Sequence, residues 1–194
     1  MLEDDKKNKG FEKWKHSTQI TLEKWKHCFK LLKLTTNDTK LRWIQLRILH
    51  NILTTNRSVS KFNKEQSHLC QFCQSHSETI HHLIWKCHKV KLFWDELTII
   101  INKRVKHAHR FKFDENVVIF GYSDQIKTDQ VCDLMILLAK FYIYRSKVQG
   151  IVLNTNIFIK EMYQRYCIEK EIQKNSIKFK SAWKPYLGLF QSLM

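Results

Sequence analysis

Apolar residues recur at three- and four-residue spacings along most of the chain, a pattern typical of amphipathic helices. The pattern predicts helices over about 14–33, 40–53, 90–104, 128–149 and 155–173. Residues 56–66 read as a turn and a short helix, and residues 175–194 predict a short final helix that breaks near Pro185. Residues 1–12 are charged and are expected to be disordered.

The helices differ in how much of their surface is apolar. Residues 14–33 carry one apolar stripe, followed by an N-cap at Asn37 or Asp38. Residues 40–53 are apolar on much of their circumference, and 128–149 nearly all round, which predicts two helices buried in a bundle. Asn154 or Thr155 is expected to cap the helix over 155–173, whose inward residues are expected to be Phe158, Met162, Tyr166 and Ile172.

The segments between these helices give a weaker signal. The basic stretch 103–113 has little periodicity and predicts a loop. Residues 117–124, VVIFGYSD, are compatible with a brief strand or a buried loop, and we favour the loop because no partner strand is evident. Four glycines and one proline in 194 residues disfavour a sandwich or barrel, which needs many tight turns.

The expected fold is therefore all-α, mainly a helical bundle, with little or no sheet. Its expected parts are a disordered tail over 1–12, a helical region over 13–105, an irregular basic connection over 106–127, and a helical region over 128–194 that packs on the first.

The net charge of +16 is large for a single domain and indicates a polyanionic partner, most often nucleic acid. Lysines greatly outnumber arginines, which favours contacts to phosphate over readout of bases. Arg42 and Arg47 stand among apolar residues, so they either reach past them to solvent or contact phosphate. The candidate phosphate contacts are Arg42, Arg47, Arg57, Lys61, Lys103, Arg104, Lys106 and Arg110.

Four residues in the middle of the chain have the spacing of metal ligands. Cys70, Cys73, His82 and Cys87 form C-x2-C-x8-H-x4-C, and three thiolates with one imidazole suit a closed, structural tetrahedral Zn²⁺ site. On a regular helix, positions five apart diverge by about 140°. We therefore expect the helix that carries His82, over about 78–86, to end just before Cys87. His81 is the nearest rival ligand.

The other cysteines, Cys28, Cys132 and Cys167, sit singly in apolar surroundings and are expected to be buried thiols. The first residues contain no apolar stretch of a secretory signal, and the longest apolar run is interrupted by Asp133 and Lys140. An intracellular location, nuclear or cytoplasmic, is expected, with no membrane partner.

The cysteine segment resembles the zinc-binding segment at the C-terminal end of reverse transcriptases from non-LTR (LINE-type) retrotransposons. That pattern is a Cys pair, Glu-Thr, two residues, His-Leu, a hydrophobic and an aromatic residue, Cys, and later Phe-Trp. Residues 41–56 are similar to the stretch that precedes it. The matching positions are Cys70, Cys73, Glu78, Thr79, His82, Leu83, Ile84, Trp85, Cys87, Phe93 and Trp94.

The resemblance selects His82 over His81 and implies a region that holds RNA or DNA during target-primed reverse transcription. The polymerase turn with its paired aspartates is absent from this sequence, as are endonuclease carboxylates, so we expect a non-catalytic domain. The chain looks like the tail of a larger element-encoded protein without its polymerase. The alternatives are a docking module for that polymerase portion and a remnant without function.

Aromatic residues near the cysteines have two possible roles. Phe72, Trp85 and Trp94 either stack on bases or pack in the core. Core packing is favoured for both tryptophans, whereas Phe72 lies between two thiolates and is the better candidate for stacking. No small-molecule substrate is expected, because no nucleophile motif is present.

Overall fold

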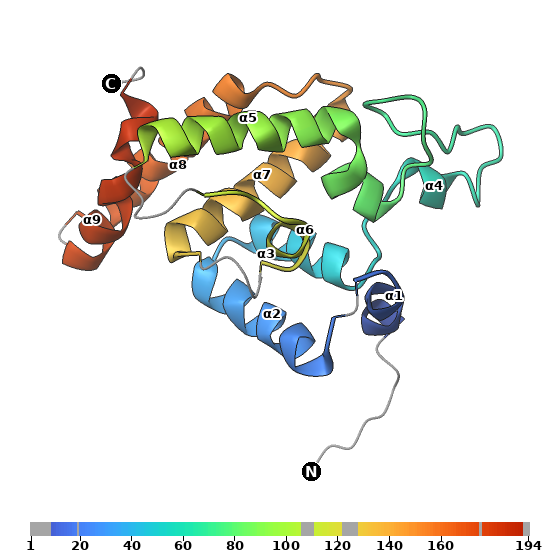
Figure 1. Cartoon of the computed structure of the whole chain (residues 1–194), viewed down its shortest axis with the longest axis horizontal. Coiled ribbons are helices and arrows are strands. Elements are labelled where there is room, and N and C mark those ends of the chain that lie inside the picture. The colour runs from blue at the N-terminus through green and yellow to red at the C-terminus, as the bar shows by residue number, and fades with distance from the viewer. Residues whose placement is uncertain (1–8, 19, 106–110, 122–127, 175, 192–194) are drawn as a thin grey trace, which may run out of the picture.

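The computed structural model of the protein describes residues 9–18, 20–105, 111–121, 128–174 and 176–191 (Figure 1). These ranges are mainly helical and contain no β-strand, which confirms the all-α prediction. The α-helices are α1 Lys9–Thr18, α2 Leu22–Thr35, α3 Thr39–Leu49, α4 Asn56–Val59, α5 His88–Arg104, α6 Glu115–Phe120, α7 Gln130–Gln149, α8 Thr155–Ile172 and α9 Ile177–Trp183. A π-helical turn, η1 His82–Lys86, and a 3-10 helix, η2 Lys184–Phe190, complete them.

The long helix α7 is the centre of the core. It packs against α2, α3, η1 and α8, and most of its side chains are buried, as the continuous apolar pattern predicts. Val148 is an exception, because it lies in the last turn and is 64% exposed. Gly150 follows at φ 67°, a left-handed conformation that favours glycine, and turns the chain toward α8.

The two ends of the molecule are built differently (Figure 1). The cysteine segment and α4 protrude at one end, beside the start of α5. At the other end of α5, α8 and α9 pack with η2. Gly188 is needed there, because a Cβ atom would lie 2.1 Å from the carbonyl oxygen of Arg104.

The prediction of one continuous helix over 14–33 is wrong, because the structure has two helices there, α1 and α2. The chain breaks around Ile20, and the Thr21 side chain caps α2 by accepting a hydrogen bond from the Lys24 backbone. Residues 9–12 belong to α1, so the expected disorder is wrong for them, and residues 1–8 lie outside the described residues. A continuous apolar stripe therefore conceals a change in helix direction.

The second predicted helix is four residues shorter at its end than expected. Asp38 caps α3, as predicted, by accepting from the backbone of Lys40 and Leu41. The helix stops at Leu49, and Asn51 takes a left-handed conformation at φ 55°. Ile52 consequently lies outside the helical stripe and is 60% exposed.

The segment over 117–124 is the clearest error of the sequence reading. Residues 115–120 form α6 rather than a loop or a strand, with Asp114 as N-cap and Gly121 at its end. Its four apolar residues are all buried. Residues 122–127 and the basic stretch 106–110 lie outside the described residues.

The C-terminal predictions are mostly confirmed. Asn154 caps α8, and the chain changes from α-helix to 3-10 helix at Lys184, next to Pro185. Phe158 and Met162 are buried, but Ile172 is 77% exposed, so its inward assignment is wrong. Among the lone cysteines, Cys28 and Cys132 are buried and Cys167 is half-buried.

Candidate metal centre and its surroundings

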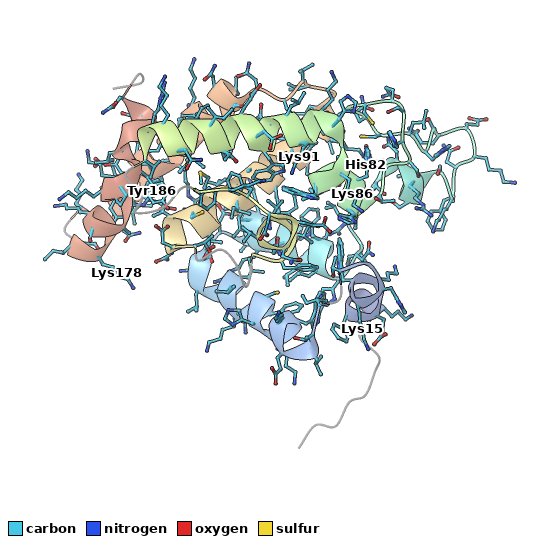
Figure 2. The ribbon with its side chains drawn as sticks, viewed as in Figure 1. Lys15, His82, Lys86, Lys91, Lys178 and Tyr186 are labelled. Atoms are coloured by element: carbon cyan, nitrogen blue, oxygen red, sulfur yellow. The ribbon has the colours of Figure 1, made fainter. Side chains whose placement is uncertain are left out.

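Cys70, Cys73, His82 and Cys87 converge on one point and form a group that could hold a metal ion. Their ligand atoms all lie within 4.8 Å of one another. The two buried sulfurs, Cys70 Sγ and Cys87 Sγ, are 3.8 Å apart. Cys73 Sγ lies 3.4 Å from His82 Nε2. Figure 2 shows His82 at the end of the molecule that carries the cysteine segment.

A small hairpin presents the first two thiols. An isolated bridge pairs Leu69 with Ser77, and the Cys70 backbone donates to the His76 carbonyl at 2.8 Å. The tip closes where the Gln74 backbone donates to the Cys70 carbonyl at 2.9 Å, with Gln74 at φ 51°. The tight turn directs both sulfurs to the same side, as the two-residue spacing predicts.

The second pair of ligands is aligned by an unusual turn. The Cys87 backbone donates to the His82 carbonyl at 2.8 Å, an i→i+5 bond that defines the π-helical turn η1. Residues five apart are therefore about one turn apart here and share a face. The prediction that the helix ends just before Cys87 is confirmed, but the sequence reading missed the wider turn.

Two side chains fix this π-helical turn. Thr79 Oγ1 accepts a hydrogen bond from the His82 backbone at 2.9 Å and so holds the start of the helix that carries the imidazole. Trp94 donates its indole N–H to the Ile84 carbonyl at 3.0 Å. Trp94 is buried, which agrees with the preference for core packing. Trp85 is half-buried, with the Lys91 ammonium 3.6 Å from its ring centre.

Glu78 clamps the centre to the rest of the molecule. Its side chain is fully buried, and its two oxygens each accept a backbone N–H at 2.8 Å, one from Asn56 and one from Gln71. Lys147 of α7 places its Nζ atom 3.3 Å from Glu78 Oε1. Sequence reasoning used Glu78 only as a motif position. Its structural role comes from contacts with Asn56, Gln71 and Lys147, which are distant in the sequence and meet only in the folded chain.

The thiols are unequal in acidity. The hydrogen bond from Cys70 is the main reason that the pKa of Cys87 falls to about 5, and backbone N–H groups at the start of α5 add to this effect. The pKa of Cys70 is raised, mainly because it donates that bond and also because it is buried. Burial raises the pKa of Cys73, but hydrogen bonds from Ser75 and His82 outweigh it and bring the pKa to about 6. The arrangement thus favours the thiolate form, which metal ions require, at Cys73 and Cys87 but not at Cys70.

His81 faces away from the cysteines. Its Nε2 lies 2.8 Å from Glu115 Oε1, and its ring meets the Trp14 ring edge-on at a centroid distance of 5.9 Å. Burial lowers the pKa of His81 despite the neighbouring carboxylate. The geometry therefore brings His82, and not His81, to the metal-binding group.

The predicted phosphate contacts do not form one surface. Arg42 donates to the Thr36 carbonyl at 2.6 Å and the Lys33 carbonyl at 3.1 Å, so it caps the end of α2. Arg47 is half-buried, with its guanidinium 4.0 Å from the centre of the exposed Trp43 ring.

The remaining candidates divide between the two ends of α5. Arg57 and Lys61 are exposed and lie together beside the hairpin. Lys103 and Arg104 lie at the far end of α5, a helix about 25 Å long. Lys106 and Arg110 fall outside the described residues. Phe72 is half-buried and packs against the core, so its ring is less accessible than its place between two thiols led us to expect.

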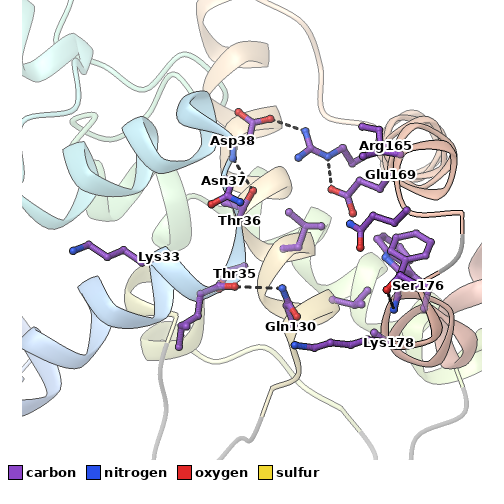
Figure 3. Close-up of a pocket in the computed structure, with 18 residues that line it drawn as sticks. Lys33, Thr35, Thr36, Asn37, Asp38, Gln130, Arg165, Glu169, Ser176 and Lys178 are labelled. Atoms are coloured by element: carbon purple, nitrogen blue, oxygen red, sulfur yellow. Dashed lines mark hydrogen bonds and ion pairs between the residues drawn. The ribbon is translucent and has the colours of Figure 1, made fainter.

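A separate polar cleft of about 360 Å³ lies between the end of α2 and helices α8 and α9 (Figure 3). Arg165 spans it, with ion pairs of 2.6 Å to Asp38 and 2.7 Å to Glu169. Gln130 donates to the Leu34 carbonyl at 3.3 Å. Much of the polar lining is thus engaged in holding the N-terminal and C-terminal helices together.

No family model matches the chain, and no curated protein matches it. Among the described residues, no helix has both the length and the apolar character that crossing a membrane requires.

Proposed function

We propose that the Cys70, Cys73, His82 and Cys87 group binds one structural Zn²⁺. The donor set of three thiolates and one imidazole is the kind that selects zinc in closed tetrahedral sites. With Zn–S bonds of about 2.3 Å, two sulfurs on a tetrahedral ion lie about 3.8 Å apart. The 3.8 Å between Cys70 Sγ and Cys87 Sγ supports this assignment.

We infer that the chain is a non-catalytic, zinc-stabilised nucleic-acid-binding domain, similar to the C-terminal region of non-LTR retrotransposon reverse transcriptases. The observation that carries this inference is the coincidence of a closed Cys3His group with a net charge of +16. A structural ion adds stability without an open coordination position, and the excess charge favours a polyanion. RNA or DNA held during target-primed reverse transcription is the partner we propose.

Zinc content and salt-dependent binding test the two parts separately. We expect one zinc per purified chain, and loss of the metal with unfolding of the hairpin in Cys73→Ser. Cys167→Ser serves as the control, because its thiol lies outside the group. Binding of fluorescent RNA and duplex DNA should weaken steeply as salt rises, since phosphate contacts release counterions. A folded protein without metal, or affinity that does not change with salt, contradicts the respective part.

A docking module for a polymerase portion is the alternative. Exposed apolar side chains at and near the cleft of Figure 3 favour it: Leu34 and Ile172 line the cleft and are 65% and 77% exposed, and Ile177 on α9 is 83% exposed. Replacing these three by Ser should improve solubility of the isolated chain and leave nucleic-acid affinity unchanged. An isolated chain that stays monomeric at high concentration without those changes counts against docking.

A further inference from the structure

An open hollow beside the metal centre has a lining suited to anions. Its volume is about 560 Å³, and it lies between α4 with the following turn and the base of the cysteine hairpin. Each lining side chain carries a hydrogen-bond donor, and none is a carboxylate. The lining residues are Arg57, Ser60, Lys61, Lys64, Gln66, His68 and Ser77.

The two walls of this hollow are tied together. Asn56 donates its side-chain amide to the Leu69 carbonyl at 2.8 Å and its backbone N–H to Glu78. The Glu78 backbone in turn donates to the His68 carbonyl at 2.9 Å. A capping box between Thr55 and Ser58 fixes the start of α4. The hairpin that carries Cys70 and Cys73 therefore holds in place the backbone segment from which the cations of the hollow project.

An exposed aromatic residue lies on the same turn as Lys61 and Lys64. Phe62 follows Lys61 on the turn after α4 and is 92% exposed, more than any other large apolar side chain among the described residues. Scattered apolar residues are common on surfaces. An aromatic ring between cations is more specific, because bases of an unpaired strand stack on such rings while their phosphates meet lysine and arginine.

We propose that Phe62 with Arg57, Lys61 and Lys64 forms a binding surface for single-stranded nucleic acid. The hollow binds phosphates of the nucleic-acid backbone, and the Phe62 ring stacks on the face of an unpaired base. Bases within a duplex are stacked on each other and do not offer that face. This proposal rests on the proposed nucleic-acid-binding function and assigns it a surface and a strand type.

The cations are tested through the salt dependence of binding. We compare zinc-loaded Arg57→Gln/Lys61→Gln/Lys64→Gln with the matched triple Lys178→Gln/Lys180→Gln/Lys184→Gln. The second triple removes the same charge from exposed positions in and next to α9, where Figure 2 labels Lys178. Three lost phosphate contacts should make the log–log salt slope for single-stranded RNA shallower by about 2. The control triple should change it far less. Equal slopes for the two triples overturn the assignment of the hollow.

Phe62 is tested through affinity at constant salt. Phe62→Ala should weaken single-stranded RNA binding about fivefold or more, with the salt slope unchanged. Phe62→Trp should retain binding, and Ile177→Ala, which truncates a side chain 83% exposed on α9, should have no effect. Duplex DNA binding should be insensitive to Phe62→Ala. Unchanged RNA affinity, or an equal loss for the duplex, overturns the stacking role.

These outcomes separate the surface from the general function. If the wild-type chain binds neither RNA nor DNA in a salt-dependent way, the proposed function fails and this surface fails with it. If the wild-type chain binds and both the hollow and Phe62 variants behave like their controls, only the surface is wrong.

Discussion

Replacing Glu78 by Gln removes the negative charge of this buried side chain and keeps the shape of the side chain. The carboxylate accepts the backbone N–H of Asn56 and of Gln71, and it faces Lys147. An amide offers one oxygen and one NH2 group, so one of the two N–H donors loses its acceptor. Because the Glu78 side chain is fully buried, no water replaces it.

The expected loss follows from these contacts. A hydrogen bond to a charged group contributes about 1.5–3 kcal/mol, and an unpaired buried donor is costly. Lys147, whose side chain is 11% exposed, also loses its counter-charge. We expect the free energy of unfolding of the zinc-loaded chain to fall by about 3 kcal/mol, or roughly 6–12 °C in Tm for a chain of this size.

Denaturant unfolding of the zinc-loaded protein, with zinc content measured in parallel, is the assay. Glu65→Gln is the matched control, because Glu65 is exposed on the same segment and should change stability by less than about 0.5 kcal/mol. The double variant Glu78→Gln/Lys147→Met should cost at least about 1 kcal/mol less than the sum of the single variants. A Glu78→Gln loss equal to that of Glu65→Gln would refute the clamp.

Two further variants test the core and one tests the π-helical turn. Burial lowers the pKa of Lys140 to about 7. Between this pH and the ordinary pKa of lysine, the Lys140 side chain is protonated in the unfolded chain but neutral in the folded chain. The free energy of unfolding therefore rises with pH over this range. Lys140→Met should raise the free energy of unfolding by at most about 3 kcal/mol at pH 7 in denaturant titrations, because losing the hydrogen bond from Lys140 Nζ to Gln45 Oε1 offsets part of the gain. This gain should shrink toward pH 10, and a constant gain contradicts it. Gly188→Ala should destabilise the chain by more than about 2 kcal/mol in thermal melts, because its Cβ atom meets backbone, and an unchanged Tm contradicts it. Trp94→Phe should cost about 1–3 kcal/mol because it removes the buried hydrogen bond from the indole to the Ile84 carbonyl, and a neutral effect in chemical unfolding contradicts it.

Helix positions were predictable where one periodic signal dominated. The pattern over 128–149 gave α7 almost to the residue, and Asp38 and Asn154 gave the N-caps, because short polar side chains before apolar stripes have few other roles. The break near Ile20 was not predictable from the stripe, since two helices in sequence can keep the same apolar phase. The helix α6 was missed because six residues carry too little periodicity to separate helix from loop.

The convergence of the four candidate ligands was predictable for a different reason. Thiols two residues apart have few arrangements that bring both sulfurs to one ion, so spacing indicated the cysteines, whereas the family resemblance selected His82 over His81. The five-residue step from His82 to Cys87 needed a backbone form that propensity does not indicate. The i→i+5 bond between them supplies it, and the helix start at Thr79 and the indole of Trp94 hold it.

Phe62 and Phe72 show why surface chemistry was the least predictable part. Phe62 follows the candidate contact Lys61, whereas Phe72 lies between Cys70 and Cys73, and this proximity to the cysteines favoured Phe72. In the folded chain Phe72 packs against the core, whereas Phe62 is 92% exposed on the turn that carries Lys61 and Lys64. Burial depends on which element covers a residue, and that information is not in the local sequence. The tie from Asn56 to Leu69 and Glu78 is what brings α4 against the hairpin, so the same contacts that stabilise the metal centre also create the cationic hollow. Loss of the metal should therefore weaken single-stranded RNA binding even though none of the four ligands lines that hollow.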